Sequence, residues 1–465
     1  MCGIVGISFA DPHAEVAPYI EHGLFALQHR GQDSASILVT DNDRGFRFYG
    51  NTGLVRDIFT EERFQHLKGC QGIGFVRYAT EGAAIQDNAY PPVGCFKDSP
   101  YRRRNFALVS NGQLNFHEGL RAECRSKGYV FRSETDTEVI AGLLETAPGP
   151  DFRQAFLSVL SRLHGAFSVL ALYEQELYAA RSRFGIRPLV WGARKEGIVF
   201  ASETRALDLL DADYCGEVAP GAYISVKNGV VTGSAEWDES PKAAPCVFER
   251  VYFSSPDSIV DGRSVKEIRE EMGRELAREH PVEADLVISV PDSSTSAAIG
   301  YAHELGIRFD SEVLLRTHHY KKRSFIEQAS GRLRVGHSKH NVIARLVKDR
   351  RIIVVDDSIV RNDTFPRIIA RLQKAGAREI HGRIASPPVQ ARCPFGIAIS
   401  SKRELVATYK TPDQIAKELG IASLKHLSLS GMLKAAKLPF FQSCHGCFSG
   451  MYPTAVPPDP ADMPH

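Results

Sequence analysis

Residues 351–361, Arg-Ile-Ile-Val-Val-Asp-Asp-Ser-Ile-Val-Arg, constrain the fold of this 465-residue chain more than any other segment. Residues 351–355 form a β-branched apolar run, which favours a buried strand. Two aspartates and a polar loop follow, and a helix is predicted from near Thr364, with Pro366 in its first turn, to Gly376. A strand that delivers carboxylates to a loop before a helix is typical of a ligand site at the edge of a parallel sheet.

The same rhythm of strand, loop and helix recurs nearby. Residues 285–290 are predicted to form a strand, and Pro-Asp-Ser-Ser and a helix over 297–305 follow it, with Gly306 as the helix end. A further strand is expected over 380–385. Repeated units of this kind predict an α/β domain with a parallel sheet and ligand sites at the carboxyl ends of its strands.

The first half of the chain has a different pattern. Short apolar runs are broken by Gly, Asn and Asp, which predicts an α+β domain of layered sheets with helices packed on them. The expected helices lie at 14–28 and 137–144, and the expected strands at 72–76, 106–109, 166–173 and 197–201. The Pro-, Lys- and Glu-rich segment 236–245 is a plausible linker. We therefore predict domains at 2–235 and 246–452, and a disordered proline-rich tail at 453–465.

Composition narrows the possible functions. The net charge is +2, with 57 basic and 55 acidic residues, which argues against a nucleic-acid binder that works by neutralising phosphates. No run of 18 apolar residues and no signal-peptide pattern is visible, so we expect no membrane association and a cytoplasmic location. Nine cysteines, an odd number, suit a reducing compartment better than a disulfide framework.

The second residue of the chain is a candidate nucleophile. Removal of Met1 would leave Cys2 with a thiol and a free α-amine, and such an amine titrates at roughly pH 7.7 to 8. It can therefore take the proton of the adjacent thiol, so that one residue supplies both nucleophile and base. The alternative is a small buried cysteine that opens a first strand.

Polar clusters lie between the predicted strands of the first half, at 28–33, 77–80, 111–112 and 133–136. Together with Cys2, they resemble the glutaminase domain of the N-terminal-nucleophile amidotransferases, an αββα sandwich. The resemblance implies that Arg77 holds the α-carboxylate of glutamine, Asp136 accepts from its α-ammonium, and Asn111 and Gly112 face the oxyanion. Alternatives are an Asn-Gly turn, a surface ion pair of Arg77, and a helix cap at Asp136.

The first half departs from that family at one stretch. Members usually show Arg-Asp-Pro-x-Gly-Ile-Arg-Pro-Leu, where this chain has Arg-Ser-Arg-Phe-Gly-Ile-Arg-Pro-Leu at 181–189. The loss of an acid and the gain of a base are expected to change a local ion pair. The proposed nucleophile is not affected.

The run at 351–361 closely resembles the ribose-phosphate loop of the amidophosphoribosyltransferases, whose second domain is a type I phosphoribosyltransferase. So do the segments 290–293, 256–258 with Phe253, 384–388 and 447–450. The resemblance implies that ammonia from glutamine attacks C1 of 5-phosphoribosyl diphosphate, the first step of purine synthesis, and that Mg²⁺ assists the leaving diphosphate. The implied ligands of the ribose phosphate and diphosphate are Asp292, Ser293, Asp356, Asp357, Ser358, Arg361, Asn362 and Thr364, of which Asp356 and Asp357 would also bind Mg²⁺.

Two departures affect this second site. The family's Val-Arg-Gly-Thr-Thr is Val-Arg-Asn-Asp-Thr here; Asn362 can adopt the left-handed conformation of glycine, whereas the Asp363 carboxylate should repel a phosphate. The family's mobile loop, Lys-Asn-Arg-Tyr-Val-Gly-Arg, is matched best by 317–323, Thr-His-His-Tyr-Lys-Lys-Arg. Later, 339–341 keeps a Lys-x-Asn pattern. Contacts to the substrate could be retuned, or the acceptor could differ.

Four cysteines match the ligands in the iron-sulfur branch of the same family: Cys246, Cys393, Cys444 and Cys447. The resemblance implies a [4Fe-4S] cluster that ties the start of the second domain to its end. Zinc is the alternative with the same ligands, and a redox dithiol would explain only the 444–447 pair. Cys70, Cys95, Cys124 and Cys215 are read as buried apolar residues.

The family resemblance also implies a homo-oligomer, a tetramer, and control by purine nucleotides. Two other functions fit the sequence. One is a paralogue that keeps the glutaminase and aminates a different acceptor. The other is a regulator that binds nucleotide through a degenerate transferase site.

Overall fold

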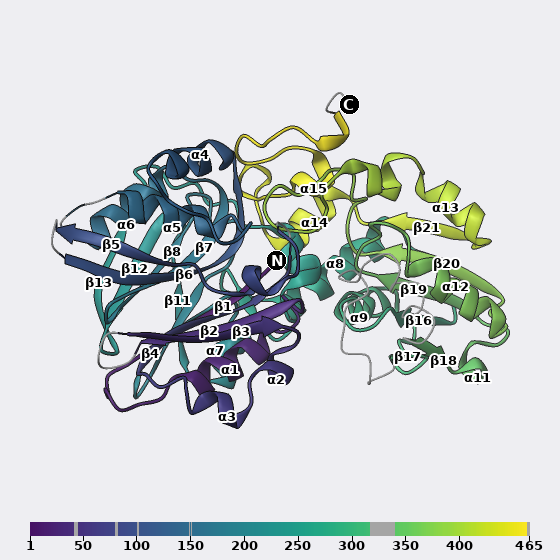
Figure 1. Ribbon diagram of the computed structural model, residues 1–465. Helices are drawn as coiled ribbons and strands as arrows, with labels where there is room; N and C mark the ends of the chain where they lie inside the picture. The colour runs from purple at the N-terminus through teal and green to yellow at the C-terminus, as the bar shows by residue number, and fades with distance from the viewer. Residues whose placement is uncertain are drawn as a thin grey trace. The chain divides into compact units, whose positions relative to one another are not determined.

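The computed structural model describes residues 1–40, 45–79, 82–99, 102–147, 149, 151–316 and 340–462 (Figure 1). The chain divides into two compact units. The first contains Met1–Pro245 together with two short segments from later in the sequence, Pro394–Ala398 and Pro453–Pro457. The second contains Cys246–Cys393, Ile399–Tyr452 and the residues from Pro458 onward.

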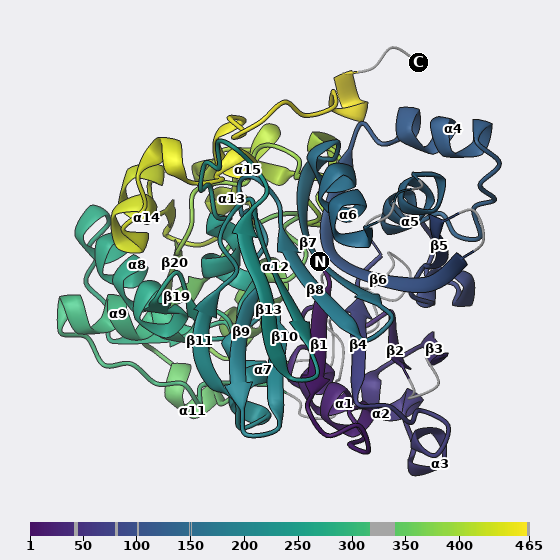
Figure 2. The same cartoon turned by 90° about the vertical axis from the view of Figure 1, so that its left-hand side faces the viewer.

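The first unit contains two antiparallel sheets. The order of the seven-stranded sheet is β11 (Asp213–Glu217), β9 (Val190–Arg194), β10 (Gly197–Ala201), β1 (Gly3–Phe9), β4 (Gln71–Arg77), β2 (Ser34–Thr40) and β3 (Phe46–Thr52). The order of the six-stranded sheet is β13 (Val230–Glu236), β12 (Ala222–Lys227), β8 (Glu176–Arg181), β7 (His164–Tyr173), β6 (Arg102–Asn115) and β5 (Val93–Ser99). Figure 2 shows β1 inside its sheet, between β10 and β4.

Three apolar layers hold this unit together. One lies between the two sheets and includes Ile4, Phe75 and Leu170. The outer two lie under helices, because each helix buries one apolar stripe against a sheet. Helices α1 (Ala17–Ala26), α2 (Val55–Ile58), α3 (Glu61–Phe64) and α7 (Thr204–Leu209) cover the first sheet, and α4 (Glu118–Ser126), α5 (Thr137–Thr146) and α6 (Phe152–Ser161) cover the second. The result is the predicted αββα sandwich.

The sandwich explains why β1 is apolar on both faces. All seven of its residues are buried, since one face meets the helices and the other meets the second sheet. A strand buried on one face alone would alternate in polarity. Its first residues therefore have a fixed position, which places Cys2, the residue before Gly3, at the end of a rigid strand.

The second unit contains the predicted parallel sheet. Its strand order is β16 (Leu286–Ser289), β19 (Arg351–Asp356), β20 (Glu379–Ile384) and β21 (Ser423–His426). The helices of this unit are α8 (Val265–Glu279), α9 (Thr295–Leu305), α11 (Ala344–Val347), α12 (Phe365–Lys374), α13 (Pro412–Leu419), α14 (Leu429–Ala436) and α15 (Gly446–Ser449), and the short strands are β14 (Ile259–Val260), β15 (Arg263–Ser264), β17 (Leu314–Arg316) and β18 (His340–Val342). Gly306 ends α9 with a φ of 66°, as its position predicts.

The segment 236–245 belongs to the first unit throughout. The Trp237 indole donates to the Ala222 carbonyl at 3.2 Å, and the Ala244 amide donates to the Phe184 carbonyl at 2.8 Å. Arg183, the base that this chain has in the 181–189 stretch, forms an ion pair with Asp238 at 2.5 Å. Although burial alone would raise the pKa of the Asp238 carboxyl, the hydrogen bond from Arg183 holds it below its ordinary value.

Residues 453–462, the described part of the proline-rich tail, differ from the predicted disordered segment. Residues Pro460–Asp462 form a short 3₁₀ helix, and the Asp459 carboxylate accepts hydrogen bonds from the Ser401 hydroxyl and the Lys402 amide, each at 3.1 Å. Charged side chains at this point give the tail a fixed partner despite its prolines. Among the described residues, no helix combines the length and the apolar character needed to cross a membrane.

Candidate active sites

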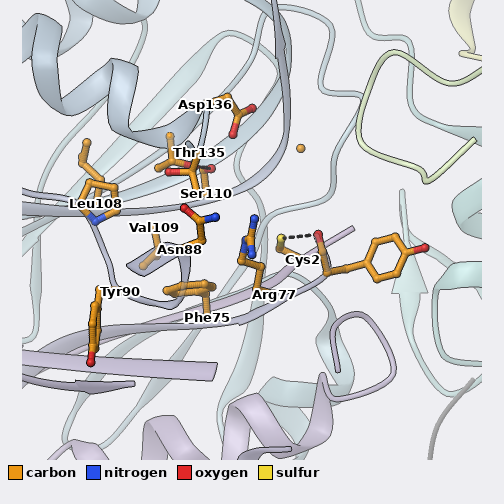
Figure 3. Close-up of a pocket in the computed structure, with 14 residues that line it drawn as sticks. Cys2, Phe75, Arg77, Asn88, Tyr90, Leu108, Val109, Ser110, Thr135 and Asp136 are labelled. Carbon is orange, nitrogen blue, oxygen red and sulfur yellow. Dashed lines mark hydrogen bonds between the residues drawn. The ribbon is translucent and has the colours of Figure 1, made fainter. Parts of the chain in front are cut away.

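Cys2 lies directly before β1 in the first unit. Its backbone nitrogen donates to Oδ1 of Asn111 at 3.2 Å, and its thiol lies 3.9 Å from the Tyr78 carbonyl oxygen (Figure 3). Its carbonyl accepts a hydrogen bond from Nε of Arg30 at 3.0 Å. Contacts from three segments distant in sequence therefore fix the position of this residue.

Arg30 and Glu203 form a buried ion pair behind Cys2. Neither side chain has any exposed surface, and Nε2 of His29 also lies 2.8 Å from Oε1 of Glu203. A buried guanidinium needs such a partner, because an unpaired charge in the interior is costly. Arg30 lay within a polar cluster of the sequence, but Glu203 carried no sequence signal, since it meets Arg30 only through the fold.

A narrow cavity of about 40 Å³ opens beside Cys2, and Figure 3 shows the side chains that surround it. It brings together four of the predicted residues, because β4, β6 and the start of α5 converge there. The lining residues are Cys2, Phe75, Arg77, Tyr78, Asn88, Tyr90, Pro92, Leu108, Val109, Ser110, Gly112, Thr135, Asp136 and Thr137.

Arg77 ends β4 and is only 5% exposed, which excludes the alternative of a surface group. Its guanidinium donates to the carbonyl oxygens of Ala83 at 3.0 Å and Gly82 at 3.2 Å. The Asn88 side chain donates to the same Ala83 carbonyl at 2.9 Å. Asn88 was not predicted, because nothing in its local sequence distinguishes it from an ordinary loop residue.

Asp136 precedes α5, but its carboxylate does not cap that helix. Oδ2 instead accepts a hydrogen bond from the Leu114 amide at 2.8 Å, which turns the carboxylate toward β6. The alternative of a helix cap is therefore wrong. An anionic group on the cavity wall near Arg77 gives the cavity one group of each charge.

Asn111 and Gly112 lie inside β6, so the alternative of an Asn-Gly turn is wrong. The Asn111 side chain is fully buried, and no hydrogen-bond partner of its Nδ2 occurs among the described residues. Gly112 has a φ of 140°. A buried amide nitrogen without a partner costs about 1–3 kcal/mol, so the Asn111 Nδ2 is a donor that an acceptor beside it would satisfy.

The second predicted site lies at the carboxyl end of β19. Asp356 and Asp357 are 7% and 6% exposed, and the Asp357 amide donates to Oδ1 of Asp356 at 2.9 Å. The hydroxyls of Ser358, at 2.6 Å, and of Ser293 donate to the Asp357 carboxylate. Burial, together with the charge of Asp357, raises the pKa of Asp356 well above its ordinary value. Such a carboxylate pair favours a cation or hydroxyl donors beside it.

The loop between β19 and α12 contains the altered positions. Asn362 has a φ of 61°, so it does adopt the left-handed conformation of the expected glycine, and Asp363 is exposed. Thr364 precedes the first residue of α12. Arg361 donates from Nε to Oε2 of Glu404 at 2.8 Å, and its guanidinium is therefore held by a carboxylate.

The remaining predicted residues of this site are placed in part. Asp292 is exposed and forms an ion pair with Arg316. The segment 317–323 and Lys339 lie outside the described residues. His340 and Asn341 belong to β18, where Arg316 pairs with His340 in the register.

The four predicted ligand cysteines all belong to the second unit and are buried, with 4% to 9% of each residue exposed. Cys246 and Cys444 are paired in a parallel β-bridge. Burial, and then the charges of Cys393, Cys246 and Cys444, raise the pKa of the Cys447 thiol well above its ordinary value. The thiols are therefore grouped closely enough to interact, although no three His, Cys, Asp or Glu side chains in the described part of the chain converge on a single metal-ion position.

Comparison with known protein families identifies both halves of the chain. A family model described as a glutamine amidotransferase domain matches residues 98–209. The amidophosphoribosyltransferase of Methanocaldococcus jannaschii is 39% identical over 98% of each chain. That of Archaeoglobus fulgidus is 40% identical and covers 98% of this chain and 99% of its own length.

Solved structures show the same similarity. The glutamine phosphoribosylpyrophosphate amidotransferase from B. subtilis, complexed with ADP and GMP, has a TM-score of 0.88 and 35% identity over 98% of each chain. A structure described as the allosteric regulatory enzyme of purine biosynthesis has a TM-score of 0.88 and 34% identity, and covers 99% of this chain and 97% of its own.

Proposed function

The chain belongs to the amidophosphoribosyltransferase family, and from that premise we propose how its two sites divide the reaction. The enzyme hydrolyses glutamine and transfers the ammonia to C1 of 5-phosphoribosyl diphosphate. The products are 5-phosphoribosylamine, glutamate and diphosphate, and the reaction is the first step of purine synthesis. We assign the glutamine half to the cavity at Cys2 and the phosphoribosyl half to the end of β19.

In the glutamine half, the α-amine of Cys2, freed by removal of Met1, takes the thiol proton. The thiolate attacks the side-chain carbonyl of glutamine, and the carbonyl oxygen becomes an oxyanion. Nδ2 of Asn111 and the Gly112 amide donate to it. The proton passes to the leaving nitrogen, ammonia departs, and water then hydrolyses the thioester to glutamate and the free thiol.

The rest of the glutamine molecule is bound by opposite charges. The Arg77 guanidinium pairs with the α-carboxylate, and the Asp136 carboxylate accepts from the α-ammonium. Arg77 now donates to two loop carbonyls, so substrate exchanges those bonds for stronger, charge-assisted ones. This positioning converts the attack into an effectively intramolecular step.

In the phosphoribosyl half, the carboxylates of Asp356 and Asp357 accept the ribose hydroxyls, and the loop from Ser358 to Thr364 binds the 5-phosphate. We assign Asp292 and Ser293 to the binding of the diphosphate. The buried carboxylate pair fits Mg²⁺, which prefers oxygen ligands and would neutralise the leaving diphosphate when bound. For Arg361 to bind the 5-phosphate, its guanidinium would have to break its ion pair with the Glu404 carboxylate.

The four cysteines fit a [4Fe-4S] cluster, since four thiolates are its usual ligands, all four residues are buried in the second unit, and Cys246 and Cys444 are paired in a β-bridge. We favour the cluster over zinc. When bound, it would supply a structural tie between Cys246, Cys393 and the 444–447 pair within the second unit. We also propose that the enzyme is a cytoplasmic homo-oligomer.

One observation supports the assignment of the first site most strongly. Asn111 accepts from the Cys2 nitrogen with Oδ1, while its buried Nδ2 has no partner among the described residues. The side-chain amide of Asn111 thus contacts the nitrogen of Cys2, the proposed base, and supplies a donor for the carbonyl oxygen of glutamine.

The test is to measure diphosphate release by Cys2→Ser with glutamine, and separately with ammonia, as the nitrogen source. The serine variant should lose the glutamine-dependent rate and keep the ammonia-dependent rate, because only the first site is changed. Cys215→Ser, an exposed cysteine of the same unit, is the control and should keep both. Glutamine-dependent release that survives Cys2→Ser would contradict the assignment.

A further inference from the structure

Residues 394–398 belong to the first unit, although the chain on both sides of them belongs to the second. The two ends of this short segment are held together by a hydrogen bond, in which the Cys393 amide donates to the Ile399 carbonyl at 2.9 Å. Phe395 is fully buried and Ile397 is 2% exposed. The segment is therefore an integral part of the first unit's interior.

Arg187 anchors the segment. Its side chain is fully buried, and Nε donates to the Phe395 carbonyl at 2.9 Å. The backbone of Arg187 is itself fixed, because its carbonyl accepts from the Ser168 hydroxyl at 3.1 Å and from Nε of Arg181 at 2.7 Å. Arg187, near the end of the 181–189 stretch, thus connects that stretch to Phe395 by a hydrogen bond.

The next residue, Gly396, lies against Gly112. A Cβ atom built on Gly396 would lie 2.9 Å from both the carbonyl carbon and the carbonyl oxygen of Gly112, and 3.2 Å from its Cα. Real Cβ atoms do not approach backbone this closely, and the φ of Gly396, 103°, also suits glycine alone. On its other side Gly112 packs against β7, where its own Cβ would lie 1.9 Å from the Ala166 oxygen.

We propose that Gly396 is a positioning residue for the oxyanion-binding amide of Gly112, and that Arg187 holds it in place. The inference rests on the proposed roles of Asn111 and Gly112. Gly112 is confined between β7 and Gly396, so its N–H is oriented by a residue that does not itself touch the glutamine. An amide misplaced by a fraction of an ångström stabilises the oxyanion less, because the strength of such a donor depends on its geometry.

The decisive variant is Gly396→Ala, whose methyl group must push Gly112 away. The expected result is a kcat for glutamine hydrolysis that falls roughly tenfold to hundredfold, with KM for glutamine little changed. The rate at which iodoacetamide alkylates Cys2 should stay as in the unmodified enzyme, because the nucleophile is untouched. Diphosphate release with ammonia should also be retained, which shows that the chain is folded.

Gly306→Ala is the matched control. Gly306 also has a positive φ, 66°, but a Cβ there would meet no atom within 4 Å, so backbone strain is introduced without a contact. Its kcat for glutamine hydrolysis should not change. Arg187→Lys keeps the charge and loses the directed Nε donor, and it should lower the same kcat without altering the alkylation rate.

An unchanged kcat in Gly396→Ala would overturn the inference, and so would an equal fall in the ammonia-dependent rate, since that pattern indicates general misfolding. Asn111→Ala separates this from failure of the proposed site. If Asn111→Ala keeps full glutamine hydrolysis, the oxyanion assignment itself is wrong. If Asn111→Ala is impaired and Gly396→Ala is not, only the positioning role is wrong.

Discussion

In the proposed mechanism, more of the glutamine chemistry depends on Asn111 than on any other residue. Its two amide atoms have separate tasks, because Oδ1 orients the nitrogen of Cys2 while Nδ2 is available to an acceptor. A buried amide that satisfies only one of its ends usually destabilises a fold. In the proposed mechanism, this is also the position where negative charge develops during the reaction.

We therefore expect Asn111→Ala to lower kcat for glutamine hydrolysis by about 10²–10³, the loss typical of one oxyanion donor. Steady-state glutamate formation measures this. Asn115→Ala is a control, because Asn115 is a second buried asparagine of β6 whose Nδ2 also has no described partner, whereas only Asn111 accepts the hydrogen bond from the Cys2 nitrogen. Comparable losses in both variants would mean that strand integrity, not the donor, is responsible.

A second residue-scale prediction concerns His426 in the second unit. Burial lowers its pKa to about 4, although its hydrogen bond to the Ser386 carbonyl at 3.1 Å favours the charged form. Because the unfolded chain binds this proton near pH 6.5, the stabilising contribution is full above that pH and is lost as the pH falls toward 4. Between pH 7 and pH 5 the loss should be about 2 kcal/mol of unfolding free energy.

The measurement compares His426→Asn with the unmodified chain in urea unfolding at both pH values. Asn keeps a donor for the Ser386 carbonyl but does not titrate, so the drop on acidification should shrink by about 2 kcal/mol. His13→Asn, at an exposed histidine, should leave the drop unchanged. Equal pH dependence in all three chains would refute a neutral, buried His426.

Sequence reasoning grouped several residues that the fold does bring together, and it missed residues that are defined by distant partners. Cys2, Arg77 and Asp136 do line one cavity. Glu203 could not be predicted, because it pairs with Arg30 across 173 positions of sequence. The bond between Arg361 and Glu404 was missed for the same reason, since neither position constrains the other locally.

At the scale of elements, the loop between β19 and α12 contains Asn362 and Asp363, where the family resemblance leads us to expect glycine and threonine. The left-handed Asn362 shows that one change preserves the backbone course, whereas Asp363 adds an exposed negative charge next to the proposed phosphate position. The conformational and the electrostatic consequences of the two substitutions are thus separable. The negative charge of Asp363 should affect the affinity for phosphoribosyl diphosphate more than the replacement of glycine by Asn362 does.

Asp363→Asn should lower KM for phosphoribosyl diphosphate roughly fivefold, which corresponds to removal of about 1 kcal/mol of repulsion. The gain should shrink at high ionic strength, because salt screens exposed charges. Initial rates with ammonia as the nitrogen source measure it without involving the first site. Asp349→Asn, an exposed aspartate that also has a positive φ, serves as the control and should leave KM unchanged.

The elements themselves were predicted unevenly. Three of the four parallel strands of the second unit were recognisable from the sequence, because strands buried on both faces read as continuous apolar runs, whereas the short strand β21 was missed. Their observed bounds, such as Arg351–Asp356, agree closely with the prediction. The strand order of the first unit was not predictable, since β1 pairs with β4 and β10, and antiparallel pairing between distant strands leaves no local pattern.

At the scale of the whole molecule, the four cysteines connect the beginning of the second unit with its end. Cys246 opens the unit and Cys447 lies near its close, so a shared cofactor would shorten the loops available to the unfolded chain. Such cross-links stabilise chiefly through the unfolded state. The prediction that these four cysteines bind one [4Fe-4S] cluster rests on the family resemblance, because the sequence alone does not distinguish a cluster from zinc.

Cys246→Ser should therefore reduce the iron content of anaerobically purified protein from about four atoms per chain, together with its brown colour. It should also lower the melting temperature of the second unit. Metal analysis and calorimetry measure the two effects. Cys124→Ser, at a buried cysteine of the first unit, should keep the iron, and a colourless unmodified chain with one zinc would contradict the cluster.

The hydrogen bond between Arg187 and the Phe395 carbonyl has a consequence for expression of the first unit alone. An expressed fragment that stops at residue 245 would contain every residue of the glutamine cavity, yet it would lack the acceptor for a guanidinium that has no access to solvent. Loss of this hydrogen bond, and of the buried Phe395 and Ile397, should make the fragment prone to aggregation. A stable fragment of the first unit would therefore have to include residues 394–398 as well as residues 1–245, so the first unit cannot be expressed as one continuous segment of the sequence.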